Sequence, residues 1–580
     1  MEKEDQATPD RGLFLRSGTA PESVPSSAAP GPVGQRTGRS SAQTLGRVVA
    51  GGVAVVACLV GLVLFLRVPP SDGVAQPKPG KAPEGSQLQP LFVGWDKPDV
   101  AIALSGQQYG YLQPCGCSEP QYGGLARRYN FLAYLKDHRG WPLVAVDLGD
   151  IPDQPKRHSQ QTLLKYVYSL KSLREMSYSA VGFGLNEMSL PLHEAMNSYA
   201  LNNPSPPVVN TSLLTREKQN DPFFLTVKAS AVGGGGKTPR VGVLALVAPS
   251  VREEAKKIND DDLKFRLDAT KALEHGLAEV RSKNVEFVVL LYQGSLKEAR
   301  GCAQYCAQRH KADKNFPAIN VILRLDDELP SGVPEKVGDS MIVGVGHKGR
   351  HIGVIGAFRT GKADEPWQIR YQLVQLGPEY ETPEGKDHQN PIHALMEEYA
   401  QDVKDANFLA KHPRKKHPVQ ITFNNAEYVG SGACKGCHPA AYKIWKDSGH
   451  AHAYATLEGP KAIRPKNRQY DPECIVCHVV GFPYETGFTD AIKTHELKNV
   501  GCESCHGPCS EHVANRNNLK IRAAINPFKA PPGEKAEQRI RRMNAIDMFC
   551  QSCHDVDNDV HWDFGPKWPK IIHMTPRNGK

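Results

Sequence analysis

The sequence predicts a multidomain protein in which an N-terminal transmembrane helix precedes a layered α/β domain and a mainly helical C-terminal domain. Three observations in the 580-residue chain lead to this prediction. An uninterrupted apolar run occupies residues 48–66, and short apolar segments alternate with helical patterns between residues 91 and 378. The pattern Cys-x-x-Cys-His occurs four times between residues 434 and 554.

The N-terminal region consists of three segments of different composition. Residues 1–46 are rich in Pro, Gly, Ser and Ala and are predicted to be a disordered tail. Residues 47–67 hold the apolar run between two arginines, and this run is long enough to cross a bilayer as an uncleaved signal anchor. The small-residue word GVA at residues 73–75 leaves a cleaved signal peptide as the alternative. Residues 68–90 form a Pro/Gly-rich linker.

The alternation of strand and helix patterns defines a predicted domain at residues 91–385. Strands that alternate with helices are typical of a layered α/β domain. Residues 386–425 are predicted to be a linker that contains a helix at 388–408. The predicted strands are 100–104, 143–146, 208–209, 241–244, 285–292, 321–323, 341–345 and 352–358, and the predicted helices are 162–176, 268–282 and 296–310.

The Cys-x-x-Cys-His pattern is the attachment site of a c-type haem. The two thiols each add to one vinyl group of the haem, and the adjacent histidine becomes an axial ligand of the iron. Paired cysteines also bind zinc, but zinc does not require a histidine after every pair. Four covalently bound haem c groups are therefore predicted, with residues 426–580 folded around them. The attachment residues are Cys434, Cys437 and His438; Cys474, Cys477 and His478; Cys502, Cys505 and His506; and Cys550, Cys553 and His554.

The predicted haem attachment indicates on which side of the membrane the chain lies and which class of partner it has. Maturation of c-type haem takes place outside the bacterial cytoplasmic membrane, so the chain is predicted to cross that membrane once, with residues 68–580 in the periplasm. The formal net charge is +9, and the dense basic block at residues 411–416 is typical of a solvated surface. We expect redox proteins or quinone-linked donors as partners, and no nucleic acid.

The words around the four motifs resemble a known family. They are CKGCHPAAYKIWKDSGHAHAYATL from Cys434, ECIVCHVVGF from Glu473, VGCESCHGPCSEHV from Val500 and FCQSCHDVDNDVHWDFGPKWPKIIH from Phe549. These words are similar to the tetrahaem cytochromes of nitrifying bacteria, the cytochrome c-554 type. The resemblance implies that His450, His512 and His573 are axial ligands on the distal side of three haems.

This implied ligand set leaves one of the four irons without a distal histidine. The family that the chain resembles has one five-coordinate haem, so the shortfall fits its pattern. His495 and His561 remain open candidates for a further ligand, whereas His452 is expected to be a surface histidine or to contact a haem propionate. An iron with an open position can bind a small molecule, whereas an iron with two protein ligands only carries electrons.

Six short sequence segments follow one another in the predicted middle domain. They are IALSGQQYGYLQP with GGLARR at 102–128, VDLGD at 146–150, YSAVGFGLNEM at 178–188, VVNTSL at 208–213, LLYQGS at 290–295 and VGHKGRHIG at 345–353. These words resemble the calcineurin-like metallophosphoesterases, in particular the periplasmic 5'-nucleotidase branch. The resemblance implies a four-layer sandwich of two sheets between helices.

The same resemblance predicts that the metal centre has been lost. Enzymes of that family use two divalent cations to activate water. Asp150 is retained, but no Gly-His-x-His word occurs near residues 323–326. Neutral amides and aliphatic side chains hold divalent cations poorly, so a degenerate domain is expected. At the other ligand positions this chain has Gln107, Tyr109, Leu185, Asn186 and Gln293.

Four cysteines follow two of these degenerate segments. Cys115 and Cys117 come after the first, and Cys302 and Cys306 come after Gln293. In the family both segments end at the same rim of the sheet, where ligands usually bind. We hypothesise that the four thiols meet there, either as two disulfides or as a four-thiolate metal or iron–sulfur site.

Together these features favour a membrane-anchored tetrahaem cytochrome that transfers electrons. The first alternative is a redox enzyme that acts on a small nitrogen or sulfur species at a five-coordinate haem. The second is a metal-dependent, nucleotidase-like hydrolase, against which the lost metal ligands argue.

Overall fold

A computed structural model describes residues 90–116, 118–155, 159–191, 205–214, 227–231, 239–258, 264–265, 268–459 and 464–573. The predicted tail and transmembrane anchor, and all but the last residue of the predicted linker, lie outside these residues, so the anchor stays a prediction. Within the described part, no helix combines the length and apolarity needed to cross a membrane. Residues 76–580 form one compact unit.

The first sheet of the middle domain has five strands in the order β13-β12-β1-β2-β3. The three strands β1, β2 and β3 are parallel, β12 is antiparallel to β1, and β13 is antiparallel to β12. The strands are β1 (Val100–Ser105), β2 (Leu143–Asp147), β3 (Ala180–Val181), β12 (His351–Arg359) and β13 (Trp367–Gln375).

The second sheet has six strands in the order β10-β11-β9-β8-β6-β5. Its four central strands are parallel, and the edge strands β10 and β5 are antiparallel to their neighbours. A separate two-stranded ribbon pairs β4 (Leu213–Leu214) with β7 (Lys264–Phe265). The strands of the six-stranded sheet are β5 (Val227–Ala231), β6 (Arg240–Val247), β8 (Phe287–Gln293), β9 (Val321–Arg324), β10 (Glu335–Val337) and β11 (Ser340–Val343).

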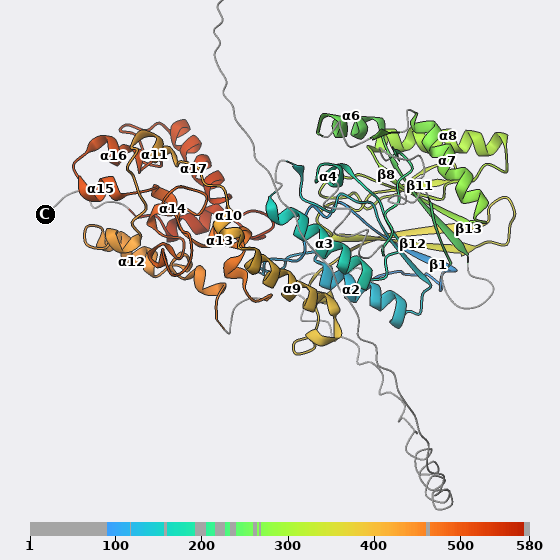
Figure 1. The fold of residues 1–580 in the computed structure, drawn as a ribbon, viewed down its shortest axis with the longest axis horizontal. Helices are drawn as coiled ribbons and strands as arrows, with labels where there is room; N and C mark the ends of the chain where they lie inside the picture. The colour runs from blue at the N-terminus through green and yellow to red at the C-terminus, as the bar shows by residue number, and fades with distance from the viewer. Residues whose placement is uncertain are drawn as a thin grey trace, which may run out of the picture. The chain divides into compact units, whose positions relative to one another are not determined.

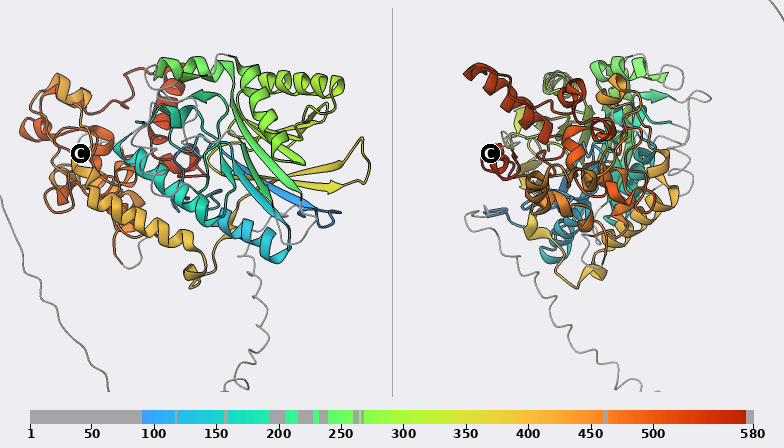
Figure 2. Two further views of the ribbon diagram at one scale, coloured as in Figure 1. Left: turned by 45° about the vertical axis from the view of Figure 1, so that its right-hand side comes forward. Right: turned by 90° about the vertical axis from the view of Figure 1, so that its left-hand side faces the viewer.

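The two sheets pack face to face, and helices cover both outer faces (Figures 1 and 2). In β1, Val100, Ile102 and Leu104 point into the core between the sheets, whereas Ala101 and Ala103 point toward the helices. This alternation follows from the two-residue period of a strand. The predicted layered α/β class is confirmed, with four layers. The covering helices are α2 (Leu125–Ala133), α3 (Gln160–Glu175) and α9 (Pro391–Ala406) on the first sheet, and α7 (Ala269–Ser282) and α8 (Leu296–Ala312) on the second.

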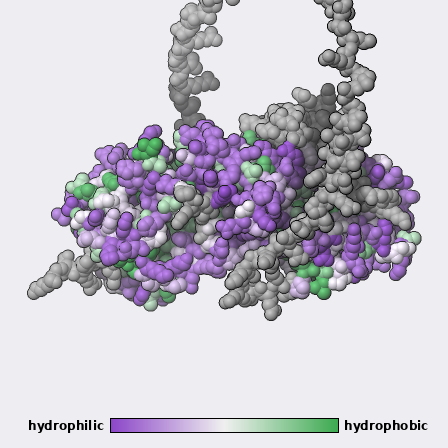
Figure 3. All heavy atoms as spheres, turned by 90° about the horizontal axis from the view of Figure 1, so that it is seen from below, coloured by the Kyte–Doolittle hydropathy of each residue, from purple (hydrophilic) through white to green (hydrophobic). Residues whose placement is uncertain are grey.

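On the face shown in Figure 3 the described surface is mainly hydrophilic, with apolar residues in small separate groups. The large apolar side chains lie instead in the cores between the layers.

Shorter elements complete the middle domain. They are the π-helix η1 (Tyr134–His138), the helices α4 (Leu185–Met188) and α6 (Pro249–Ile258), and the 3-10 turns η4 (Pro378–Tyr380) and η5 (Asp387–Gln389).

Three sequence predictions about this domain differ from the structure. The segment predicted as strand 208–209 makes only an isolated bridge from Val208 to Val181. Strand β13 was not predicted because Gln and Arg residues interrupt its apolar positions at the sheet edge, where most of its residues are only partly buried. The helix predicted within the linker, α9, packs into the core of the middle domain through Ile392, Met396 and Val403.

The C-terminal part is built from short helices, as predicted. Its apolar side chains gather in two small clusters, one around Phe482 and Phe488 and one around Val419 and Ile521. The helices are α10 (Phe408–Lys411), α11 (Pro418–Thr422), α12 (Pro439–Lys446), α13 (Pro472–His478), α14 (Cys502–His506), α15 (Ser510–Ala514), α16 (Leu519–Ala524), α17 (Ala536–Cys550) and α18 (Phe564–Lys567). The 3-10 turns are η6 (Ser431–Cys434), η7 (Gly449–His452), η8 (Tyr454–Thr456), η9 (Arg468–Tyr470), η10 (His495–Leu497) and η11 (Trp568–Lys570).

Candidate functional site

Each Cys-x-x-Cys-His motif forms one helical turn. The second and third motifs lie within α13 and α14. In the first motif the His438 amide donates to the Cys434 carbonyl at 2.9 Å, and in the fourth the His554 amide donates to the Cys550 carbonyl at the same distance. Residues three apart in a helical turn share a face, so both thiols of a motif point to the same side.

Three motif histidines face a second histidine. The ring centroids of His438 and His512 are 6.2 Å apart. Those of His450 and His554 are 6.0 Å apart, and those of His506 and His573 are 5.9 Å apart. The structure therefore brings each of the three predicted distal histidines to a different motif histidine.

The spacing of these pairs fits an iron atom between the two rings. A metal–imidazole bond is about 2 Å long, and a ring nitrogen lies about 1 Å from the ring centre, so two axial imidazoles should have centroids about 6 Å apart. The three observed distances all have this value. The residues present therefore fit a haem with two histidine ligands at each pair.

Hydrogen bonds orient three of the motif histidines for ligation through Nε2. The Nδ1 atom of His478 bonds the Ala453 carbonyl at 2.6 Å, and that of His506 bonds the Ile525 carbonyl at 2.7 Å. The Nδ1 atom of His554 bonds the Asp559 carboxylate at 2.9 Å. A carbonyl accepts only from a protonated nitrogen, so Nδ1 carries the proton and Nε2 is free to bind a metal.

Burial keeps these imidazoles in the neutral form that a metal requires. Loss of hydration lowers the pKa of His450, and the neighbouring His554 adds to the effect. Burial is also the main cause that lowers the pKa of His478, His506 and His512. At neutral pH all four are available as ligands without losing a proton.

His478, in the second motif, has a different environment. Among the residues that the structure describes, no second histidine ring packs against it. Neither His452 nor the two open candidates fill this role: His452, His495 and His561 are exposed, and His495 lies 3.4 Å from Glu496. The geometry thus separates one motif from the other three.

Contacts between thiols place the four motifs in a spatial order. Cys434 and Cys502 hydrogen-bond to each other, as do Cys477 and Cys553. Cys505 is close enough to Cys550 for their charges to interact. These contacts join the first motif to the third, the third to the fourth and the fourth to the second.

The sequence segments of the middle domain that correspond to metal-binding motifs also lie close together. A side chain at Gly184 would meet both the Asp150 carboxylate, at 2.3 Å, and the Gln293 amide, at 2.6 Å. The Gln107 amide donates to the Tyr109 hydroxyl at 2.9 Å and to the Asp326 carbonyl at 3.1 Å. The predicted positions therefore form one site at the ends of β2, β8 and β9.

The polar groups of this site bond one another. The Gln293 amide donates to the Leu148 carbonyl at 2.7 Å, and the Asn186 amide donates to the Pro152 carbonyl at 2.9 Å. Within the described ranges, no group of three or more His, Cys, Asp or Glu side chains is arranged to hold a metal ion. His347, which the sequence analysis did not assign to the site, bonds the Asp326 carbonyl at 2.8 Å.

Two buried carboxyl groups remain in the site. Glu187 accepts hydrogen bonds from the main-chain amides of Gly184, Asp150 and Ile151 at 2.8–3.0 Å. Burial and the nearby Asp150 carboxylate raise the pKa of Glu187 to about 8. Burial also raises the pKa of Asp150, to about 6. The pair of carboxyl groups therefore holds a proton near neutral pH.

The three described cysteines of the middle domain lie in two places, and the four-thiol hypothesis, which also needs Cys117, stays a prediction. Cys302 and Cys306 lie along α8 and pack into the core beneath the second sheet, where their thiols hydrogen-bond. Cys115 lies elsewhere, beside Gln121 and Asn558. With a rise of about 1.5 Å per residue, α8 carries its two cysteines roughly 9 and 15 Å from its first residue, Leu296. Cys117 lies outside the described residues.

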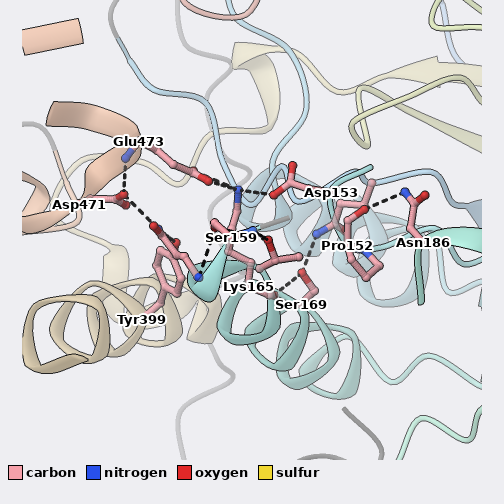
Figure 4. A network of polar contacts seen from close by, with 12 residues as sticks. Pro152, Asp153, Ser159, Lys165, Ser169, Asn186, Tyr399, Asp471 and Glu473 are labelled. Atoms are coloured by element: carbon pink, nitrogen blue, oxygen red, sulfur yellow. Dashed lines mark hydrogen bonds and ion pairs between the residues drawn. The ribbon is translucent and has the colours of Figure 1, made fainter. Parts of the chain in front are cut away.

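Contacts between the middle domain and the haem-attachment region were not predicted. Buried Lys165 of α3 bonds Glu473 at 2.8 Å and Asp153 at 3.4 Å (Figure 4). Gln161 of the same helix donates to Asp471, the N-cap of α13, at 3.0 Å. Nothing in the sequence indicates that acidic residues next to a Cys-x-x-Cys-His motif would pair with a lysine far away in the chain.

The geometry of the C-terminal part fits the attachment of c-type haem, and comparison with known proteins agrees with this fit. Residues 433–507 match the model of the family described as cytochrome c554 and c-prime. A 93-residue segment is 37% identical to cytochrome c-554 of Nitrosomonas europaea, over 14% of this chain and 40% of that protein. The predicted resemblance of the C-terminal region is thus confirmed, and the chain spans less than half the length of this relative.

Solved structures similar to the chain come from another group of proteins. The sulfate thiohydrolase SoxB of Thermus thermophilus is 14% identical, with a TM-score of 0.42, over 57% of this chain and 63% of that one. A 5'-nucleotidase precursor, also from Thermus thermophilus, is 18% identical, with a TM-score of 0.42, over 55% and 60%. The calcineurin-like phosphoesterase YfkN of Bacillus subtilis is 14% identical, with a TM-score of 0.37, over 51% and 98%.

Proposed function

We propose that this chain is a tetrahaem c-type cytochrome that transfers electrons on the periplasmic side of a bacterial cytoplasmic membrane. The observation that carries the proposal is the set of three histidine pairs with ring centroids 5.9–6.2 Å apart, each containing one motif histidine. The family match at residues 433–507 supports it.

Different residues of the chain would attach the haems and orient their ligands. When bound, haem supplies a one-electron carrier at each motif. The cysteines fix the attachment points, and the thiol contacts set their order as second, fourth, third, first. The hydrogen bonds to Nδ1 hold the rings of His478, His506 and His554 each in one orientation, which favours the same ligand set in both oxidation states.

A redox titration of the full chain in detergent tests this function. We expect mass spectrometry to find four covalent haems per chain and the absorption spectrum to change reversibly as electrons are added and removed. Fewer than four haems, or reduction that cannot be reversed, would overturn the proposal.

A second function is favoured by the environment of His478. Because the structure places no histidine ring opposite it among the described residues, its haem is a candidate five-coordinate site for a small nitrogen or sulfur species. Nitric oxide should then bind to one haem of the four, and hydroxylamine or a related species should be turned over. Binding without turnover would leave electron transfer as the function.

We propose that the middle domain has lost its dimetal hydrolase activity. Three of the former ligand positions support this, because they hold the neutral amides Gln107, Asn186 and Gln293, which bind divalent cations poorly and donate to Tyr109 and to main-chain carbonyls instead. Phosphatase assays on the full chain with added manganese should show no activity above that of an Asp150→Ala variant. Activity that disappears in the variant would restore the hydrolase interpretation.

A further inference from the structure

A short loop connects the fourth motif to the middle domain. Residues 555–560 follow His554 directly, and we call them the 555–560 loop. One end of the loop contacts the His554 ring, and the other contacts strand-end residues of the phosphoesterase-like domain.

At the haem end, the loop presents Asp559 to the proximal histidine. The Asp559 carboxylate accepts from His554 Nδ1 at 2.9 Å and from Lys567 at 3.0 Å, and its side chain is 12% exposed. Trp562 stacks on the His554 ring with centroids 4.4 Å apart and an angle of 24°. By contrast, His478 and His506 bond neutral main-chain carbonyls at Nδ1.

At the other end, the middle domain clamps the loop. Lys348 and Arg350 both pair with the Asp557 carboxylate. The Ser118 hydroxyl donates to the Asn558 carbonyl at 3.1 Å and accepts from the Val560 amide at 3.0 Å. Asp559 is thus flanked on both sides by residues that the middle domain holds.

Internal bonds make the loop rigid between these two ends. The Asp555 side chain accepts from the Asp557 and Asn558 amides at 3.0 and 2.9 Å. The Asp559 amide donates to the Asp555 carbonyl at 2.8 Å. A displacement of Asp557 is therefore passed to Asp559 through the main chain.

We propose that Asp559, held by this clamp, is a positioning residue that lowers the reduction potential of the fourth haem. A carboxylate that accepts from Nδ1 makes the imidazole a stronger electron donor than a carbonyl does, and a stronger donor stabilises ferric over ferrous iron. The middle domain thereby gains a role: it sets the driving force for the electron that enters or leaves the fourth site. The inference rests on the proposed electron-transfer function.

Spectroelectrochemical titration of the full chain tests the inference. In Asp559→Asn, one of the four one-electron components should shift about tenfold toward the reduced form, or about 59 mV upward, with the other three unmoved. Asp563→Asn is the matched control, because it makes the same charge change at an exposed site four residues away. A shift no larger than that of Asp563→Asn would overturn the proposal.

Two further variants separate positioning from loss of structure. Lys567→Met leaves the Asp559 carboxylate bonded to His554 but removes the cation that also bonds this carboxylate. The reduction potential of the same component should therefore move downward. The double variant Lys348→Gln, Arg350→Gln loosens the clamp and should move it upward by less than Asp559→Asn does. If the double variant leaves all four potentials unchanged, the role of the middle domain is wrong. A wild-type chain without reversible haem reduction would instead contradict the electron-transfer function itself.

Discussion

His450 and His452 stand two residues apart in η7 and differ in what they face. The His450 ring lies 6.0 Å from the ring of His554, whereas His452 is exposed. Without the family resemblance, the sequence leaves both as candidate ligands, since each is a histidine in the same word. The turn geometry separates them, because residues two apart on a tight helix point in different directions.

Replacing the paired histidine should change the spin state of one haem. His450→Ala removes an axial ligand from the fourth haem, so that one further iron becomes high-spin. Magnetic circular dichroism of the oxidised protein measures the high-spin fraction. His452→Ala is the control and should leave the spectrum of the wild type; a matching change in both variants would refute the assignment.

The buried Glu187 should make stability depend on pH. Its pKa is raised from 4.5 to about 8 in the folded chain, so between these values the native state holds a proton that the unfolded state has lost. The free energy of unfolding should therefore fall as pH rises from about 5 to about 8. Urea titrations followed by circular dichroism check this. The fall should be smaller in Glu187→Gln; an equal or larger fall in that variant would contradict the raised pKa.

At the scale of elements, the contact between α3 and α13 joins the middle domain to the second motif. Lys165 of α3 reaches Glu473, which directly precedes Cys474, and Gln161 reaches the N-cap Asp471. Both helices are predictable from sequence: α3 from its pattern, and α13 from Pro472 and the motif. Their contact is not, because it depends on tertiary packing that leaves no periodic signal in either segment.

Removal of the lysine should weaken this contact. Lys165→Met leaves the acidic groups of Asp153 and Glu473 without their cation, at a cost of about 1–3 kcal/mol. Hydrogen-exchange mass spectrometry should show faster exchange in α3 and α13 together. Lys271→Met, at an exposed position of α7, serves as the control and should leave both helices unchanged. Equal protection of the two helices in Lys165→Met and the wild type would contradict the role of Lys165.

At the scale of the whole molecule, sequence predicted the order of domains and the class of each. Period-two patterns in buried strands and the spacing of the four motifs carry that information directly. The placement of Cys115 against Asn558, far along the chain, was not predictable. The packing of Cys302 and Cys306 of helix α8 against the core beneath the second sheet was not predictable either. A strand end can be predicted from sequence, but the direction of a helical side chain depends on how the helix packs.

Membrane attachment is the whole-molecule prediction that depends on residues 47–67. Replacing residues 1–67 by a cleavable export signal should release a haem-loaded chain into the soluble periplasmic fraction, because the apolar run is then absent. The unaltered chain should stay in the membrane fraction after a carbonate wash. Recovery of the unaltered chain as a soluble periplasmic protein would favour a cleaved signal peptide.

The resonance Raman spectrum of the oxidised full chain tests the central claim most directly. Its spin-state marker bands count six-coordinate and five-coordinate irons in one measurement. Three histidine pairs, and a His478 that faces no second histidine ring among the described residues, predict three low-spin haems and one high-spin haem. Four low-spin haems would show that the second site has a distal ligand, and two or more high-spin haems would contradict the paired-histidine geometry.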